Sequence, residues 1–375
     1  MHIVFFVCAL ASIAAVVLIC LFLFANGIPA MKEIGLLNFL TGAKWKPGND
    51  IYGILPMILG SIYITAGAVV IGVPVGLLTA IFMAFYCPKK LYGLLKPCTE
   101  LLAGIPSIVY GFFGMVVIVP CIRTVAALFG ADISGSSILA ASVLLGIMIL
   151  PTVVSLSRTS LEAVPRSYYE GSVAMGATHS ETVFRIMSPA ARSGITASLI
   201  LGIGRALGET MAVVMVAGNA PAYPSGLFSS FRVLTANIVM EMGYAGEVQE
   251  GALVATGVIL LLFVLAVNLL FGAISSRAVR RISSRQPRGK RPARESRLHG
   301  SAARLARRIR DWFGALGSRI RICRIGQGVA VFAGVAVAAV LVLIIGFILV
   351  KGLPYLVRNP SLIWGRFEFG GEKVT

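Results

Sequence analysis

Residues 170–189 read EGSVAMGATHSETVFRIMSP, a polar stretch between long apolar runs. Four arginines lie within it or on its flanks: Arg158, Arg166, Arg185 and Arg192. In a chain this apolar, a charged helical hairpin on the basic side of a membrane needs a protein partner to dock against. A cytoplasmic motor protein is the natural partner, so the stretch indicates a transport machine rather than a receptor or an enzyme.

The composition requires a bilayer around most of the chain. Hydrophobic residues make up 57% of the sequence and charged residues 13%, and the mean hydropathy is +0.90. A soluble domain has too little interior to hide so much apolar surface. The net charge of +18 is concentrated in one region, because sixteen of the 33 basic residues lie between Arg277 and Arg324.

The sequence carries no motif for catalysis, nucleotide binding or metal binding. Its six cysteines form no CxxC pair, and its three histidines are far apart. Gly289-Lys290 is followed by Arg291 rather than Ser or Thr, so the phosphate-binding loop GxxxxGK[ST] is absent. We therefore expect no cofactor, no metal, no catalytic residue and no ATP hydrolysis by this chain itself.

Apolar stretches predict an all-α, polytopic membrane protein. A helix needs about 20 apolar residues to span roughly 30 Å of hydrocarbon. Stretches of this length occur seven times, near 3–25, 56–86, 99–128, 136–157, 195–217, 251–273 and 327–350.

The distribution of basic residues predicts the orientation. Lys89, Lys90 and Lys96 follow the second stretch, arginines surround the loop after the fourth, and the basic cluster follows the sixth. Loops rich in Lys and Arg stay in the cytoplasm. We therefore expect a cytoplasmic amino terminus and a periplasmic Thr375.

Two kinds of segment are expected between the sixth and seventh stretches. Residues 277–300 have no periodicity and predict a basic, flexible linker. Beyond Arg304, one helical face is apolar and the rest is rich in arginine, which is typical of a helix lying on anionic lipid. Nucleic-acid binding is the rival interpretation of such a basic run, and flanking transmembrane helices make it the weaker one.

Two distant parts of the chain resemble each other, as internal repeats do. The first stretch ends in Asn26-Gly27-Ile28-Pro29 and the seventh in Lys351-Gly352-Leu353-Pro354, each followed by Leu and Trp residues. Transporters are often built from repeats. We expect a six-span module over 1–276, the linker over 277–300, and the truncated start of a second module over 301–375.

The 170–189 stretch resembles the EAA motif, E-A-A-x3-G-x9-I-x-L-P, of permease subunits of ATP-binding-cassette importers. Glu170, Gly176, Ile186 and Pro189 match it; the departures are Gly171 and Ser172 for two alanines and Ser188 for leucine. The resemblance implies a coupling helix, formed by these residues, that sits in a groove of a cytoplasmic ATPase. An ordinary amphipathic hairpin is the alternative.

Two further motifs narrow the resemblance to the first permease of phosphate-specific importers. They are LAGIPSIVYG over 102–111 and GRALGETMAV over 204–213, and the likeness covers essentially all of 1–276. The tail from about 320 resembles the opening of the second permease of the same system, which suggests a fusion. The resemblance implies a type I importer fold in the bacterial inner membrane. Its partners would be an ATPase dimer, a second permease subunit and a periplasmic phosphate-binding protein, and its substrate inorganic phosphate.

The substrate path is expected around Arg205 and Glu209, four residues apart in the fifth stretch. Each ionised group costs about 2.5–3.5 kcal/mol at mid-bilayer, so such residues usually face water or pair with each other. The resemblance implicates this Arg and Glu in phosphate passage, with Thr210 beside them. A buried ion pair that only locks helix packing is the alternative.

Gly104-Ile105-Pro106-Ser107 is expected to break the third stretch, freeing backbone groups for an anion or a gate. Ser107 and Tyr110 would then be pore-lining donors, although a bare kink explains the pattern equally well. Two rival functions remain: a permease for sulfate, molybdate or phosphonate, and a membrane scaffold or sensor that acts through the basic linker.

Overall fold

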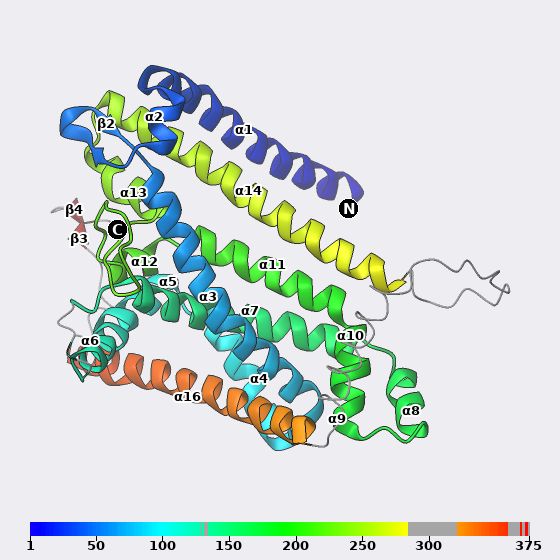
Figure 1. Ribbon diagram of the computed structural model, residues 1–375. Coiled ribbons are helices and arrows are strands. Elements are labelled where there is room, and N and C mark those ends of the chain that lie inside the picture. Colours follow the sequence, from blue (N-terminus) through cyan, green and yellow to red (C-terminus); the bar gives the residue numbers. More distant parts are fainter. Residues whose placement is uncertain (129, 131–133, 284–320, 359–367, 370–371, 374–375) are drawn as a thin grey trace, which may run out of the picture.

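The fold is known from a computed structural model, which describes residues 1–128, 130, 134–283, 321–358, 368–369 and 372–373. These residues are mostly helical (Figure 1). The strands are short: β1 (Trp45–Lys46) pairs antiparallel with β2 (Ile51–Tyr52), and β3 (Glu368–Phe369) with β4 (Glu372–Lys373).

Six segments of the described chain are long and apolar enough to cross a membrane: Val4–Ile34, Leu55–Tyr86, Ser107–Leu128, Ile138–Glu162, Glu247–Ala273 and Gly328–Ile348. They belong to α1 (His2–Ile34), α3 (Leu55–Ile81) with the π-helical turn Phe82–Tyr86, α5 (Ser107–Phe113) to α6 (Val119–Leu128), α7 (Ile138–Glu162), α14 (Glu247–Ser283) and α16 (Arg321–Arg358). The expected all-α, multi-span architecture is confirmed.

The fifth expected span, 195–217, is not one helix. Helix α11 (Arg192–Gly208) ends at Gly208, Glu209 is extended, and α12 (Met211–Val216) begins two residues later. A carboxylate oxygen of Glu209 accepts the backbone N–H of Ala212 at 3.3 Å, which satisfies one of the free N–H groups at the start of α12. The prediction of an uninterrupted span was therefore wrong. At its other end, α11 meets the segment His179–Ala190 at 68°, and α11 reaches the length of a seventh crossing only when this bent neighbour is counted with it.

The break in the third span is confirmed. Helix α4 (Lys89–Gly104) ends at Gly104, and α5 begins at Ser107. Pro106 has no N–H to donate, and a residue before proline avoids the helical region; Ile105 is accordingly extended, with ψ 127°.

The core lies between α3 and α7. A Cβ at Gly72 of α3 would stand 2.6 Å from the carbonyl oxygen of Gly146 on α7, so only glycine permits this approach. Close packing through small residues is the usual way in which membrane helices associate. On α7, Ala140, Leu144 and Leu145 are buried in the main apolar cluster.

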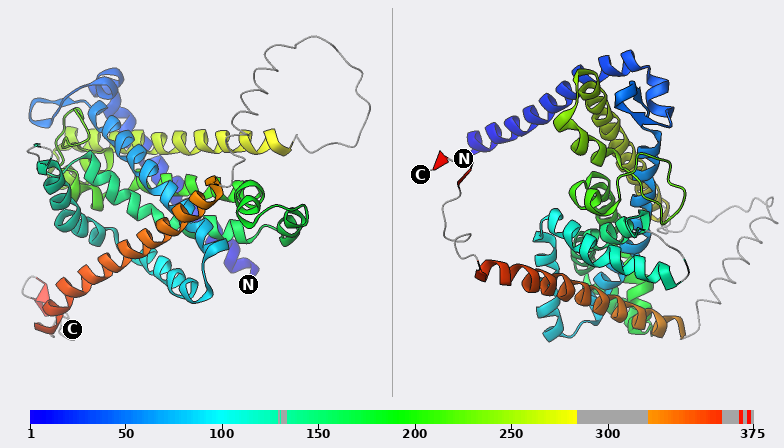
Figure 2. Two further views of the ribbon diagram at one scale, coloured as in Figure 1. Left: turned by 60° about the horizontal axis from the view of Figure 1, so that its bottom comes forward. Right: turned by 90° about the vertical axis from the view of Figure 1, so that its left-hand side faces the viewer.

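The two ends of the molecule differ (Figure 1). One end carries α8 (Arg166–Ala174), α9 (His179–Thr182) and α10 (Ser188–Ala190). The opposite end carries α2 (Leu36–Thr41), the β1–β2 hairpin and α13 (Leu234–Glu241). Helix α1 packs along α14 on one flank, and α16 covers α3 and α4 on another (Figure 2).

The helix before the expected linker is longer than predicted. Helix α14 continues to Ser283, so residues 277–283 are helical and the predicted boundary at 277 is wrong. The rest of the expected linker, and the amphipathic helix expected after Arg304, lie outside the described residues.

Candidate functional site

A cavity of about 760 Å³ lies between α7, α11 and α14. Its lining is Thr152, Leu156, Ala197, Ile200, Leu201, Gly204, Arg205 and Asn268. Each of the three helices thus contributes one polar side chain: the Thr152 hydroxyl from α7, the Arg205 guanidinium from α11 and the Asn268 carboxamide from α14. None of these eight residues is acidic, so Arg205 supplies the only charge in the lining.

Arg205 occupies the last turn of α11 and is half-buried. A cation is stabilised there because the C-terminal end of a helix carries partial negative charge. The guanidinium stays protonated and offers five N–H donors in a fixed plane. The predicted pathway residue therefore lines a cavity that suits an anion.

Glu209 does not line this cavity. The prediction placed it four residues from Arg205 on one helix, but α11 ends between them and no ion pair joins them in the described chain. Its carboxylate caps α12, its carbonyl accepts the Thr235 hydroxyl at 3.1 Å, and it lines a separate, small pocket with Ser61 and Thr65. The predicted i, i+4 pair is thus wrong in geometry. Thr210 sits at the same break, where its hydroxyl donates to the carbonyl of Gly208 at 3.4 Å.

Ser107 and Tyr110 do not line this cavity. Tyr110 is only 1% exposed, and its hydroxyl donates to the carbonyl of Leu102 at 2.7 Å. It therefore adds a short hydrogen bond to a carbonyl whose i+4 residue, Pro106, has no N–H and which otherwise accepts only the Ile105 N–H at 3.4 Å. Tyr110 therefore stabilises the kink, and half-buried Ser107 is the first residue of α5.

The segment from Arg166 to Ala190 forms a compact hairpin. Gly176 turns the chain after α8 with φ +84°. The Thr178 side chain and the Glu181 carboxylate form a reciprocal capping box that starts α9, and its hydrogen bonds lower the pKa of Glu181. Hydrogen bonds of 2.8–2.9 Å, Tyr169 to His179 and Ser172 to Thr182, join the two arms. We name residues 166–190 the hairpin.

The outer face of the hairpin is uncovered. No residue of α8 is buried, and Glu170, Gly171 and Pro189 are exposed. Beside them a groove of about 470 Å³ is lined by Ser167, Tyr168, Gly171, Ser172, Met175, Ala177 and Ile186. Met175 is 89% exposed. Of the six predicted coupling residues, five are exposed and the sixth, half-buried Ser172, lines this groove; the exposed ones are Glu170, Gly171, Gly176, Ile186 and Pro189.

The inner face of the hairpin is anchored to the membrane-spanning helices. The Tyr86 hydroxyl, at the end of the α3 span, donates to the Ser180 hydroxyl oxygen at 3.2 Å, and the Tyr86 ring packs edge-on against His179 with 4.9 Å between ring centroids. Val183 and Met187 are buried. A displacement of the hairpin would therefore be passed to α3.

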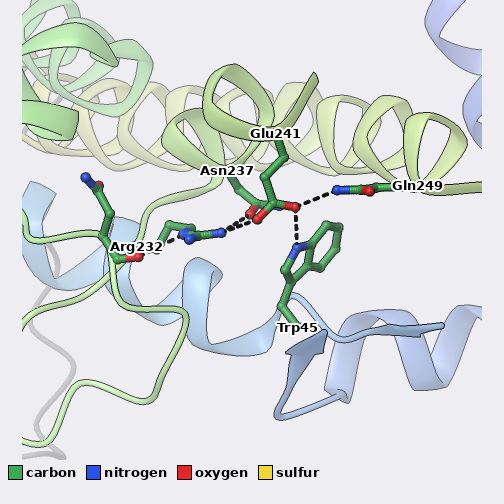
Figure 3. Close-up of polar contacts among 6 residues, drawn as sticks. Trp45, Arg232, Asn237, Glu241 and Gln249 are labelled. Atoms are coloured by element: carbon green, nitrogen blue, oxygen red, sulfur yellow. Dashed lines mark hydrogen bonds and ion pairs between the residues drawn. The ribbon is translucent and has the colours of Figure 1, made fainter. Parts of the chain in front are cut away.

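A buried polar network stands at the opposite end (Figure 3). The Glu241 carboxylate accepts from Trp45 Nε1 at 2.7 Å and from Gln249 at 2.9 Å, and it forms an ion pair with Arg232. Arg232 also donates to the Asn237 side chain at 2.9 Å. The network ties the β1–β2 hairpin to α13 and α14.

Sequence reasoning missed Asn268, Thr152 and this network. Asn268 interrupts an otherwise apolar run, LLFVLAVNLLF over 261–271, and that interruption was the available signal. The pairing of Arg232 with Glu241 gave no signal, because nine residues separate them outside any one helix. Among the described residues, no group of three His, Cys, Asp or Glu side chains is placed to hold a metal.

Comparison with known proteins identifies the family. Residues 72–280, which contain the cavity and the hairpin, match the family described as the inner membrane component of binding-protein-dependent transport systems. The chain belongs to this family. It is therefore a multi-pass permease subunit of an ATP-binding-cassette importer, and such a permease works with an ATPase and a periplasmic binding protein.

Several curated relatives resemble this permease over most of their own length. It is 39% identical over 276 residues to the probable ABC transporter permease protein YqgH of Bacillus subtilis, covering 72% of this chain and 88% of the relative. It is 36% identical over 279 residues to the phosphate transport system permease protein PstC of Mesorhizobium japonicum, covering 70% and 84%. Among solved structures, a bacterial alginate ABC transporter superposes with a TM-score of 0.51 at 15% identity, covering 73% of this chain and 95% of that one, which supports the fold alone.

Proposed function

We propose that this permease carries inorganic phosphate across the bacterial inner membrane, driven by ATP hydrolysis on a separate subunit. The observation that carries the proposal is the cavity between α7, α11 and α14, whose only charge is the Arg205 guanidinium. Relatives at 36% and 35% identity that are named phosphate transport permeases point to the same substrate.

The chemistry of the cavity supports an oxyanion. A guanidinium binds phosphate oxygens through two parallel N–H···O bonds, and such charge-assisted bonds are roughly twice as strong as neutral ones. Since Glu209 is engaged at the start of α12, it does not neutralise Arg205. An anion is the ligand that such a lining favours.

The hairpin is proposed as the surface that docks on the ATPase. Exposed Glu170 and the groove beside it offer a charge and an apolar contact, while Tyr86 and the buried Val183 link the hairpin to the spans. ATP-driven closure of two ATPase subunits would push the hairpin and rock α3 and α11, which would open the cavity to the other side. Charge reversal by Glu170→Lys should reduce copurification of the ATPase; undiminished copurification would contradict the docking.

The orientation follows from this assignment. With the hairpin on the cytoplasmic side, the amino terminus is cytoplasmic and the end of α16 periplasmic. The outer loops 26–55 and 218–250 would receive phosphate from a periplasmic binding protein. The Glu241 network would keep the first of these loops rigid against the second.

A second permease subunit is proposed to complete the pore, and α16 to be the first span of such a subunit fused to this one. Helix α16 packs closely on the α3 span, because Gly334 leaves room for the ring of Phe82 and Ala330 is fully buried. Along α1, by contrast, Phe5, Leu10 and Leu18 are exposed. That bare surface requires lipid or a partner permease.

Anion competition in cells tests the proposed function. In a strain that lacks its other phosphate transporters, the complete importer should restore uptake of radiolabelled phosphate, and unlabelled sulfate, molybdate or phosphonate should not compete. Competition by one of those anions with equal strength would reassign the substrate. Undiminished uptake after deletion of this chain, with only gene regulation altered, would instead favour a sensor.

A further inference from the structure

We infer that Asn268 recognises the hydroxyl of protonated phosphate and so separates phosphate from sulfate within the cavity. The inference rests on the proposed function, because it concerns the same cavity and the same substrate. It assigns a role to α14, a helix whose sequence predicted only a membrane span.

The first observation is an unsatisfied acceptor. Oδ1 of Asn268 is buried and has no hydrogen-bond partner in the described chain, although the residue as a whole is half-buried and lines the cavity with Arg205. A buried acceptor without a partner costs about 1–3 kcal/mol, and a ligand that donates to it removes that cost. The site is therefore incomplete without a donor.

The second observation is the close approach of α14 to α11. Gly204 precedes Arg205, and a Cβ at Gly204 would stand 3.5 Å from Asn268 Oδ1. The carboxamide thus lies beside the turn of α11 that carries the guanidinium. A ligand held by Arg205 would lie within reach of the amide.

The third observation concerns the hydrogen-bond donors and acceptors of the polar side chains that line the cavity. Arg205 has donors only, and the Thr152 hydroxyl has one donor and two acceptor lone pairs. Asn268 brings the only side-chain carbonyl among the lining residues. An aspartate would also accept a hydrogen bond, but its negative charge would neutralise Arg205 and repel the anion. The amide accepts a hydrogen without repelling a dianion.

Substrate chemistry completes the argument. Near neutral pH inorganic phosphate retains at least one P–OH group, whereas sulfate retains none. A site built to hydrogen-bond a substrate hydroxyl rejects an analogue that lacks it, because the polar group of the site then stays unpaired. Sulfate would find Arg205 but would leave Asn268 Oδ1 unsatisfied, whereas arsenate, which retains its hydroxyl, would satisfy both.

The test is equilibrium binding of radiolabelled phosphate to the complete importer in nanodiscs, without the binding protein, in competition with sulfate and arsenate. For the wild type, arsenate should compete and sulfate should compete at least tenfold more weakly. Asn268→Leu should weaken phosphate binding about tenfold and abolish the difference between the two competitors. Asn268→Ala, which removes both amide atoms at little risk to the helix, should do the same.

The controls separate the possible failures. Leu269→Ala changes the next residue, which is exposed and outside the cavity, and should behave as the wild type. If the leucine and alanine variants still exclude sulfate, the role of Asn268 is wrong while the proposed function stands. If the wild-type importer neither binds nor transports phosphate, the proposed function fails and the inference with it.

Discussion

Two arginines of this chain show how one residue type takes two roles. Arg232 is neutralised by Glu241 in a buried network, whereas Arg205 lines a cavity that contains no acidic residue. The sequence singled out Arg205 together with Glu209 as intramembrane charges, and of the two only Arg205 lines the cavity. It could not predict that Glu209 would turn away, because that depends on where α11 ends and on the N–H of Ala212. Residues four apart in the sequence lie on the same helical face only where the helix continues through both of them.

The Arg232–Glu241 pair should stabilise the fold strongly. Glu241→Gln keeps the shape of the side chain but leaves the Arg232 charge largely buried and uncompensated. Removing one partner of a buried pair costs about 3–5 kcal/mol, and the slight exposure of this pair favours the lower end. Chemical unfolding of the purified chain measures this loss in the free energy of unfolding, and Glu250→Gln, at an exposed position, is the control. Equal stability of the two variants would contradict the structural role of the network.

Among the elements, long apolar spans were predictable and their interruptions only in part. The break at Pro106 could be predicted because proline lacks an N–H and constrains its neighbour. The break at Glu209 could not, since neither Gly208 nor Glu209 forces a helix to end. The hairpin was recognisable from Glu170, Gly176 and Pro189. Its internal bonds, such as Tyr169 to His179, required the fold.

The two glycines of the hairpin make a matched pair of tests. Gly176 has φ +84°, where alanine costs roughly 1–2 kcal/mol. Gly171 lies inside α8 with open space around its Cα, so alanine there should stabilise the helix by about 0.5–1 kcal/mol.

We expect Gly176→Ala to reduce copurification of the ATPase and ATP-driven uptake together, and Gly171→Ala to preserve both. Copurification and uptake assays, run in parallel on the two variants and the wild type, test this expectation. Loss of docking by the Gly171 variant alone would mean that α8 meets its partner through the bare backbone at that position.

At the scale of the whole molecule, the sequence predicted six of its seven expected spans in their order, missed the interruption of the fifth, and did not predict which spans are neighbours. Periodicity and length identify an apolar helix, yet they carry no information on which face meets which helix. The placement of α16 against α3 depends on the fit of Gly334 to Phe82, and that of α1 against α14 on Gly27. Such complementary surfaces, far apart in sequence, appear only in the folded chain.

The proposed topology predicts opposite sides for the two termini. An alkaline phosphatase reporter after Thr375 should be active, because that enzyme works in the periplasm, and the same reporter before Met1 should be inactive. Activity at the amino terminus together with inactivity at Thr375 would invert the orientation and place the hairpin outside, away from any ATPase.

The most direct measurement is ATP-driven uptake of radiolabelled phosphate by the complete importer in proteoliposomes, with Arg205→Ala compared with the wild type. Arg123→Ala, an exposed arginine on α6 outside the cavity, serves as the control. The guanidinium is the only charge in the lining, so its loss should lower phosphate uptake at least tenfold while the complex still assembles, and the control should transport normally. Wild-type uptake by the Arg205→Ala importer would contradict the account.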